Sequence, residues 1–173
     1  MYKFILVPNL GLWRIEELEG NAKLSRIDLS SFGVNIGISC IAQIAVGDDS
    51  FAIVTKSGNV YMCGNNKHGQ LGIGRDVSHV DKLSKVKFEQ YFDPEDKVIH
   101  VDMGPQNTIL LTEKGSVYTC GANKHGQLGI GGNKSTKKLI NKKFNKVDFD
   151  LQDDADKVIH ASITEQNAGL LTE

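Results

Sequence analysis

Short apolar runs separated by polar or glycine-containing turns recur along most of the chain, and they predict strands rather than helices. The runs are only about five residues long and are rich in the β-branched and aromatic residues that strands favour. Tight hairpin turns are expected at 56–59 and 113–116, where a glycine can supply a positive φ. The expected strands are 2–7, 41–46, 51–55, 60–63, 98–103, 108–112, 117–120, 158–163 and 168–172, with further edge strands opening at Lys23, Lys82 and Lys138.

The pattern is repeated, because nine consecutive residues occur twice. Residues 66–74 and 123–131 both read NKHGQLGIG, and a Cys-Gly pair stands one residue upstream of each copy. Aligned on these copies, the expected strands form units of four, each followed by the glycine-rich turn. A four-stranded antiparallel meander repeated at this period is typical of β-propeller blades, which pack against neighbours on both sides.

We therefore expect an all-β chain of about three β-propeller blades in an incomplete ring. The predicted units are 1–22, the last strand and exit turn of a blade, with 9–12 as a worn copy of the turn; 23–81, a blade; 82–137, a blade; and 138–173, a blade lacking its fourth strand. Residues 13–19 are expected to be a linker. A ring needs at least about four blades, so residues 2–7 are expected to complete a blade outside their own chain, in a second chain or among further blades, unless the chain is a fragment.

The repeats resemble the regulator of chromosome condensation repeat. The resemblance implies a seven-bladed propeller, of which this chain is under half, and it implies protein partners. The chain departs from the family pattern at Ser50, Asn107 and Asn167, where the family usually has histidine, at Thr164 in place of glycine, and at Cys63 and Cys120 in place of an aromatic residue. The matching positions are Gly47, Thr55, Gly58, Val60, Tyr61, Gly64, Asn66, Gly69, Gln70, Leu71, Gly72 and Gly74, and then Gly104, Thr112, Gly115, Val117, Tyr118, Gly121, Asn123, Gly126, Gln127, Leu128, Gly129 and Gly131.

Composition narrows the function classes. The 173 residues are 40% hydrophobic and 24% charged, as in globular proteins, and a net charge of −1 gives no reason to expect a nucleic-acid or membrane partner. Three cysteines without CxxC spacing argue against a disulfide framework or a zinc site and for a reducing compartment. We expect the cytoplasm, with the nucleus or a cilium as alternatives.

Candidate chemistry is sparse, and we predict no catalytic residue, metal or cofactor. His68 and His125 fall in turns, and His100 and His160 fall on strands of neighbouring blades, which are not expected to bring the two imidazoles together as a metal pair. The paired aspartates at 48–49 and 153–154 are expected to be solvated loop residues. The glycine-rich turns do not stand between a strand and a helix, as a phosphate-binding loop would.

The favoured function is a non-enzymatic protein–protein interaction scaffold. The alternatives are a guanine nucleotide exchange factor for a Ran-like small GTPase, which the founding family member implies, and a structural component of a large cytoskeletal or ciliary assembly. Structural repeat turns are expected at Gly64, Asn66, Gly69, Gln70, Leu71, Gly72, Gly74, Gly121, Asn123, Gly126, Gln127, Leu128, Gly129 and Gly131. Partner-contact loops are expected at Asp48, Asp49, Lys67, His68, Gln106, Lys124 and His125.

Overall fold

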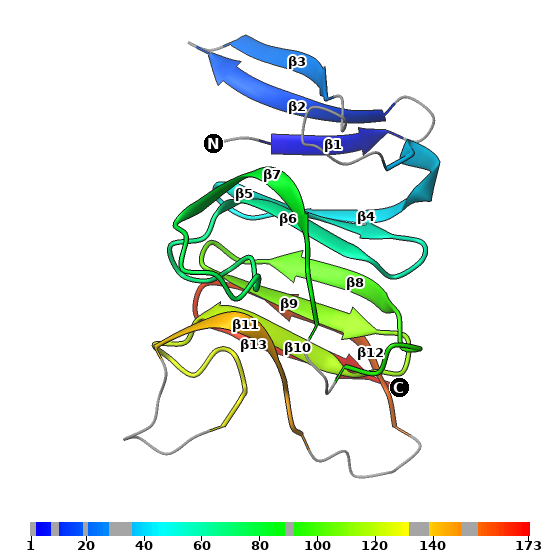
Figure 1. Cartoon of the computed structure of the whole chain (residues 1–173), viewed down its shortest axis with the longest axis vertical. Helices are drawn as coiled ribbons and strands as arrows, with labels where there is room; N and C mark the ends of the chain where they lie inside the picture. Colours follow the sequence, from blue (N-terminus) through cyan, green and yellow to red (C-terminus); the bar gives the residue numbers. More distant parts are fainter. Residues whose placement is uncertain are drawn as a thin grey trace.

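The computed structural model consists of antiparallel sheets, and the N-terminal sheet and the two four-stranded sheets lie one beyond the other along the long axis (Figure 1). The only helical element among the described residues is a short 3₁₀ turn, η2 (Ile38–Cys40). The structure describes residues 3–7, 11–18, 21–27, 36–88, 92–131, 139–149 and 156–173.

Two complete four-stranded meanders form the centre of the chain, which confirms the predicted fold class. In each sheet the strands lie side by side in chain order and every neighbouring pair is antiparallel. The first sheet contains β4 (Ile41–Val46), β5 (Ser50–Thr55), β6 (Val60–Asn65) and β7 (His79–Lys85). The second contains β8 (Val98–Met103), β9 (Asn107–Thr112), β10 (Val117–Ala122) and β11 (Ile140–Lys146).

The predicted unit boundaries differ from the sheets. Strand β7 contains Lys82 but pairs with β6, and β11 pairs with β10. The edge strands therefore finish a sheet instead of opening the next one, and the sheets run from 41 to 85 and from 98 to 146. The physical reason is the glycine-rich turn, which returns the chain antiparallel to the strand that precedes it.

The N-terminal segment forms a three-stranded sheet of its own. It contains β1 (Lys3–Val7), β2 (Gly11–Leu18) and β3 (Asn21–Ile27), in that order. The predicted linker at 13–19 is wrong over the described part, because β2 pairs with a strand on each side and so satisfies its backbone despite its glutamates. Strand β1 pairs with β2, so it is not a lone strand that completes another blade. Residues 9–12 were predicted to be a diverged copy of the repeated turn. Residues 9–10 lie outside the described residues, and Gly11 and Leu12 begin β2.

The C-terminal sheet has two described strands, β12 (Val158–Ile163) and β13 (Ala168–Thr172), which form an antiparallel hairpin. Strand β12 packs on both β8 and β9 of the preceding sheet, just as β8 packs on β4 and β5. The first strand of each of these three sheets carries a register shift at the same place, between 41 and 43, 98 and 100, and 158 and 160.

Apolar side chains fill the space between successive sheets. Strands β5 and β9 lie in the middle of their sheets and are buried at every position, because each is covered on both faces. The largest cluster joins the two complete sheets, and it contains Ala45, Ala52, Val54, Val60, Met62, Leu71, Val86, Val98, Val101, Met103, Leu110, Tyr118, Cys120 and Phe144.

Candidate functional site: the repeated turns and the loop rim

Each copy of the repeated turn is stabilised from within by its asparagine. The Asn66 carboxamide oxygen accepts a hydrogen bond from Leu71 N at 3.1 Å, and Asn123 accepts one from Leu128 N at the same distance. Three glycines in each copy have positive φ, between 60° and 82°, a conformation that other residues adopt only at a cost. The sequence fixes this shape in both copies because the asparagine and the three glycines recur.

The glutamine of each turn reaches the next sheet. Gln70 is fully buried, and its amide nitrogen lies 3.5 Å from Pro105 O, in the turn between β8 and β9. Gln127 donates in the same way to Glu165 O at 2.9 Å, in the turn between β12 and β13. Because the side-chain oxygens of both glutamines accept bonds from backbone N–H groups in their own turns, each turn is tied to its own sheet and to the following one.

The first turn is also held by β11, the outer strand of the next sheet. Gly74 N donates to Lys142 O at 2.7 Å, and Ile73 forms an isolated antiparallel bridge with Lys143. A Cβ added at Gly72 would lie 2.3 Å from the Phe144 ring, so only glycine fits there. The first turn is therefore packed against β11, and the side of the turn that faces β11 has no room for a ligand.

A second set of bonds joins the first strands of successive sheets. The Gln43 side chain donates to Val101 O at 3.0 Å and accepts from Val101 N at 2.9 Å. His100 occupies the same place one repeat later, and its Nε2 lies 2.9 Å from Ala161 O. The Asp102 carboxylate accepts from both Ser162 Oγ at 2.8 Å and Ile163 N at 2.9 Å. Gln43 and Asp102 were not among the predicted site residues, although alignment of the repeats places Gln43, His100 and His160 at one position.

The two strand histidines are close together, contrary to the prediction. The ring centroids of His100 and His160 are 4.8 Å apart, with the rings tilted by 49°, because adjacent first strands bring equivalent positions into contact. Burial lowers the pKa of His100, and the neighbouring His160 lowers it further. Within the described ranges, no three His, Cys, Asp or Glu side chains are arranged to hold a metal ion.

The predicted contact residues lie in turns at one edge of the stacked sheets. Asn65 N donates to Asp49 O, and Ala122 N donates to Gln106 O, so the turn after the first strand of each sheet lies beside the repeated turn. We call residues 47–49, 66–70, 104–106 and 123–127 the loop rim. On this rim Asp48, Asp49, Lys67, Lys124 and His125 are exposed, whereas His68 and Gln106 are half-buried.

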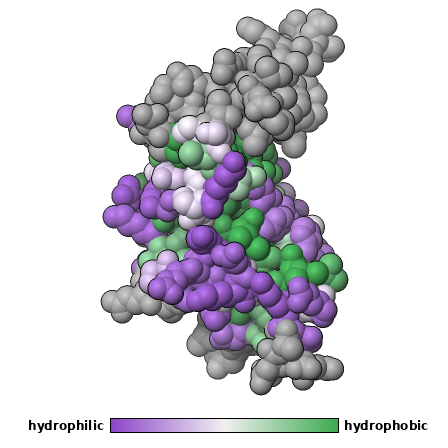
Figure 2. All heavy atoms as spheres, turned by 90° about the vertical axis from the view of Figure 1, so that its right-hand side faces the viewer, coloured by the Kyte–Doolittle hydropathy of each residue, from purple (hydrophilic) through white to green (hydrophobic). Residues whose placement is uncertain are grey.

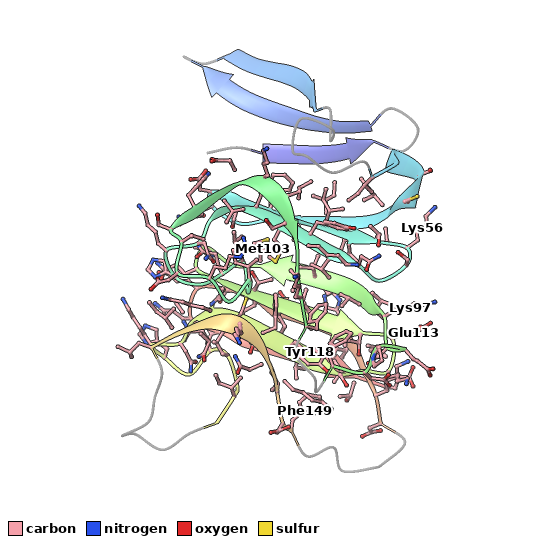
Figure 3. All side chains as sticks on the ribbon, in the orientation of Figure 1. Lys56, Lys97, Met103, Glu113, Tyr118 and Phe149 are labelled. Atoms are coloured by element: carbon pink, nitrogen blue, oxygen red, sulfur yellow. The ribbon has the colours of Figure 1, made fainter. Side chains whose placement is uncertain are left out.

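The opposite edge carries the hairpin turns between the second and third strands. Lys56, Lys97 and Glu113 lie there together, away from the loop rim (Figure 3). Hydrophilic residues cover much of the described part of this edge, with smaller apolar areas between them (Figure 2). An ion pair between Lys114 and Asp93 lowers the pKa of the Asp93 carboxyl, mainly through the side-chain hydrogen bond.

The departures from the family pattern have different structural outcomes. Asn107 is buried and donates to Thr164 O at 2.9 Å, so it bonds the next sheet. The Ser50 hydroxyl is buried without a hydrogen-bond partner among the described residues, and Asn167 is exposed. Thr164 keeps the turn that glycine forms elsewhere, because its N–H donates to Asn167 O at 2.7 Å as Gly47 N does to Ser50 O and Gly104 N to Asn107 O. Its hydroxyl adds a bond from Asn167 N at 3.1 Å.

The cysteines are free thiols, and two of them are core residues. Burial raises the pKa of Cys63 to about 12 and that of Cys120 well above its usual value, so both stay protonated and unreactive at neutral pH. Cys40 is exposed. Neither buried cysteine therefore has the environment of an activated nucleophile.

Stacked four-stranded meanders, joined by identical turns that bond the following sheet, define a protein of the β-propeller repeat class. Models of the regulator of chromosome condensation (RCC1) repeat match residues 57–111 and 114–147, and a second model of the same repeat matches 41–70 and 98–127. The chain belongs to the RCC1 repeat family. No helix among the described residues is long and apolar enough to cross a membrane.

Relatives in this family are much longer than the chain. A secretion-regulating guanine nucleotide exchange factor from Bos taurus is 36% identical over 126 residues, which are 70% of this chain and 23% of the relative. Human WBSCR16 covers 98% of the chain with a TM-score of 0.74 at 17% identity, and Prp20p from Saccharomyces cerevisiae covers 98% with a TM-score of 0.71 at 15% identity. The chain spans 42% and 41% of those two structures.

Proposed function

We propose that the chain is a non-enzymatic protein-interaction module whose loop rim binds a protein partner. One observation carries the proposal: the Asn side chains stabilise the turns from within and the Gln side chains bond the next sheet, while the neighbouring charged side chains remain exposed. Asp48, Asp49, Lys67 and Lys124 point to a partner with charges of both signs, since none of them forms an ion pair with another described residue. Loops held by a rigid scaffold are where binding residues concentrate.

Charge reversal tests this proposal. The chain carrying Asp48→Lys, Asp49→Lys and Lys124→Glu is compared with the wild type as bait in a pull-down from the native source, with bound proteins identified by mass spectrometry. The control reverses Lys56 and Glu113, which are also exposed and lie on the opposite edge. A partner that is lost from the rim variant and retained by the control supports the proposal, and equal loss or equal retention contradicts it.

Guanine nucleotide exchange on a small GTPase is the second candidate function. It is favoured by the similarity to a protein named as a secretion-regulating guanine nucleotide exchange factor and by a solved relative whose title gives binding to Gsp1p and histones. Release of a fluorescent guanine nucleotide from a Ran-like GTPase, with and without the chain, separates the candidates. We expect no acceleration by the chain alone, and acceleration that the rim variant abolishes would replace the scaffold proposal.

Assembly and location complete the proposal. We infer that further blades or a second chain extend the stack of sheets. Such an extension would suit a structural component of a large cytoskeletal or ciliary assembly. Three free cysteines favour a reducing compartment, which we take to be the cytoplasm, with the nucleus or a cilium as alternatives. Imaging of the tagged protein in the native cell distinguishes these locations.

A further inference from the structure

We propose that His100 and His160 form a two-nitrogen binding site for a divalent transition-metal ion such as Zn²⁺ or Ni²⁺. The site uses β8 and β12, the first strands of neighbouring sheets, and it is independent of the loop-rim proposal. Imidazole nitrogen is a preferred ligand of these ions. Water would fill the remaining coordination positions.

The two histidines end identical five-residue segments. Residues 96–100 and 156–160 both read DKVIH. The first strands of successive sheets pack together and carry the same register shift, so equivalent positions of β8 and β12 meet. Gln43 holds the corresponding position of β4. The repeated segment therefore brings two imidazoles to one place, where the preceding repeat has an amide.

The distance between the two rings fits a shared ion. With a metal–nitrogen distance of about 2.0–2.1 Å, two imidazoles bound to one ion at an angle between about 90° and 110° have ring centroids about 4.5–5.2 Å apart. The ring centroids of His100 and His160 are 4.8 Å apart. An ion could therefore bind both side chains without a movement of the strands.

The hydrogen bond of His100 leaves one of its ring nitrogens for an ion. Nε2 lies 2.9 Å from Ala161 O, and because a carbonyl oxygen can only accept, Nε2 of the neutral ring carries the proton and Nδ1 has a free lone pair. Among the described residues, Nδ1 has no hydrogen-bond partner. Metal-binding histidines characteristically donate their second N–H to a carbonyl or carboxylate in this way, which fixes the tautomer and the orientation of the ring.

Comparison with Gln43 argues against a purely structural role for the pair. Gln43 makes two hydrogen bonds to the backbone of Val101, one as a donor and one as an acceptor. His100 makes a single bond of this kind to β12 and keeps an unused acceptor. Glutamine therefore joins first strands better than histidine does, and the two histidines favour a role that an amide cannot fill.

The site is held in place and is accessible to an ion. The Asp102 carboxylate accepts from Ser162 Oγ and Ile163 N, which ties β8 to β12 two residues beyond the pair. Its other oxygen accepts from Met103 N, so Asp102 orients the strands and is not a ligand. His100 is half-buried even though β8 packs against both β4 and β12, so solvent reaches its ring.

Calorimetric titration with Zn²⁺ tests the proposal on the whole chain. All variants are untagged and carry Cys40→Ser, which removes the exposed thiol as a competing ligand. We expect one equivalent of Zn²⁺ to bind, with affinity at least tenfold lower in His160→Gln and in His100→Gln. His160 is exposed, and Gln43 shows that glutamine is compatible with the position of His100, so both variants should fold. The matched control is His79→Gln, which removes an exposed strand histidine 3.3 Å from the Asp81 carboxylate and should change the affinity less than twofold.

Nitrogen chemical shifts provide a second readout that a packing contact would not change. In long-range proton–nitrogen spectra, Zn²⁺ should shift Nδ1 of His100 while Nε2 keeps its proton. The proposal is overturned if Zn²⁺ does not bind saturably or if Nδ1 of His100 does not respond. It is also overturned if binding survives His100→Gln or His160→Gln, or if His79→Gln weakens it as much, since the ion would then be adventitious only.

Discussion

A pair of matched glycine substitutions separates backbone strain from packing between sheets. Gly69 and Gly126 occupy the same position in the two copies of the turn, with φ of 76° and 82°. Alanine at either position must adopt a left-handed backbone, which costs about 1–2 kcal/mol. This cost is common to both variants, so it cancels when the two are compared.

The packing cost falls on one variant alone. A Cβ at Gly69 would lie 2.9 Å from both Asn141 O and Lys142 Cα, and these are backbone atoms of β11 that cannot move independently of the strand. Forcing an extra methyl group into a packed region costs about 1–3 kcal/mol. No described atom lies within 4 Å of the corresponding Cβ at Gly126. We therefore expect Gly69→Ala to lower the free energy of unfolding by about 1–3 kcal/mol more than Gly126→Ala does.

Urea unfolding followed by circular dichroism measures the difference directly. Both variants should retain the wild-type dependence on urea concentration, and the midpoint should fall further for Gly69→Ala. Equal midpoints would refute the conclusion that β11 packs against the first turn. A lower midpoint for Gly126→Ala would show that the second turn, not the first, is the covered one.

Three other expectations follow from the contacts. The pKa of His100 is below its usual value of 6.5 in the folded state, so the unfolded chain binds more protons and stability should fall as pH drops below about 6.5. His100→Gln should flatten this pH dependence of the free energy of unfolding, measured in urea titrations at several pH values. An unchanged pH dependence would contradict the role given to His100. Cys40 should be the one thiol that iodoacetamide labels in the native chain, as peptide mapping would show, because the other two are buried; labelling of Cys63 at a similar rate would contradict this. Asn66→Ala should cost about 1–3 kcal/mol in urea unfolding, because it leaves the buried Leu71 N–H without its acceptor, whereas Ala at the exposed Asn167 should cost far less.

Local patterns predicted most strands, because the repeat allows the same pattern to be read twice. Strands 41–46 and 98–103 begin and end as expected. The edge strand at Lys82 was placed in the wrong sheet, because the sequence of a short strand between long connections does not indicate which neighbouring strand it pairs with. Strand β2 was missed because its glutamates resemble a linker, while its backbone bonds come from β1 and β3.

Contacts between sheets were harder to predict than the sheets. The proximity of His100 and His160 depends on how two first strands pack, and nothing near either histidine in the sequence specifies this distance. The reach of Gln70 to Pro105 is likewise a contact across the interface between sheets. The contact residues of the loop rim remain a prediction, although their turns share one edge.

The bond from Gly74 N to Lys142 O has a consequence for the order in which the chain becomes structured during translation. The first repeated turn belongs to the sheet that ends at Lys85, yet its packing partner is the outer strand of the following sheet. On the ribosome, the first sheet can pair its own strands before its turn is covered, and the cover arrives only after β11 has left the exit tunnel. The first complete sheet is thus finished only after its successor has been synthesised.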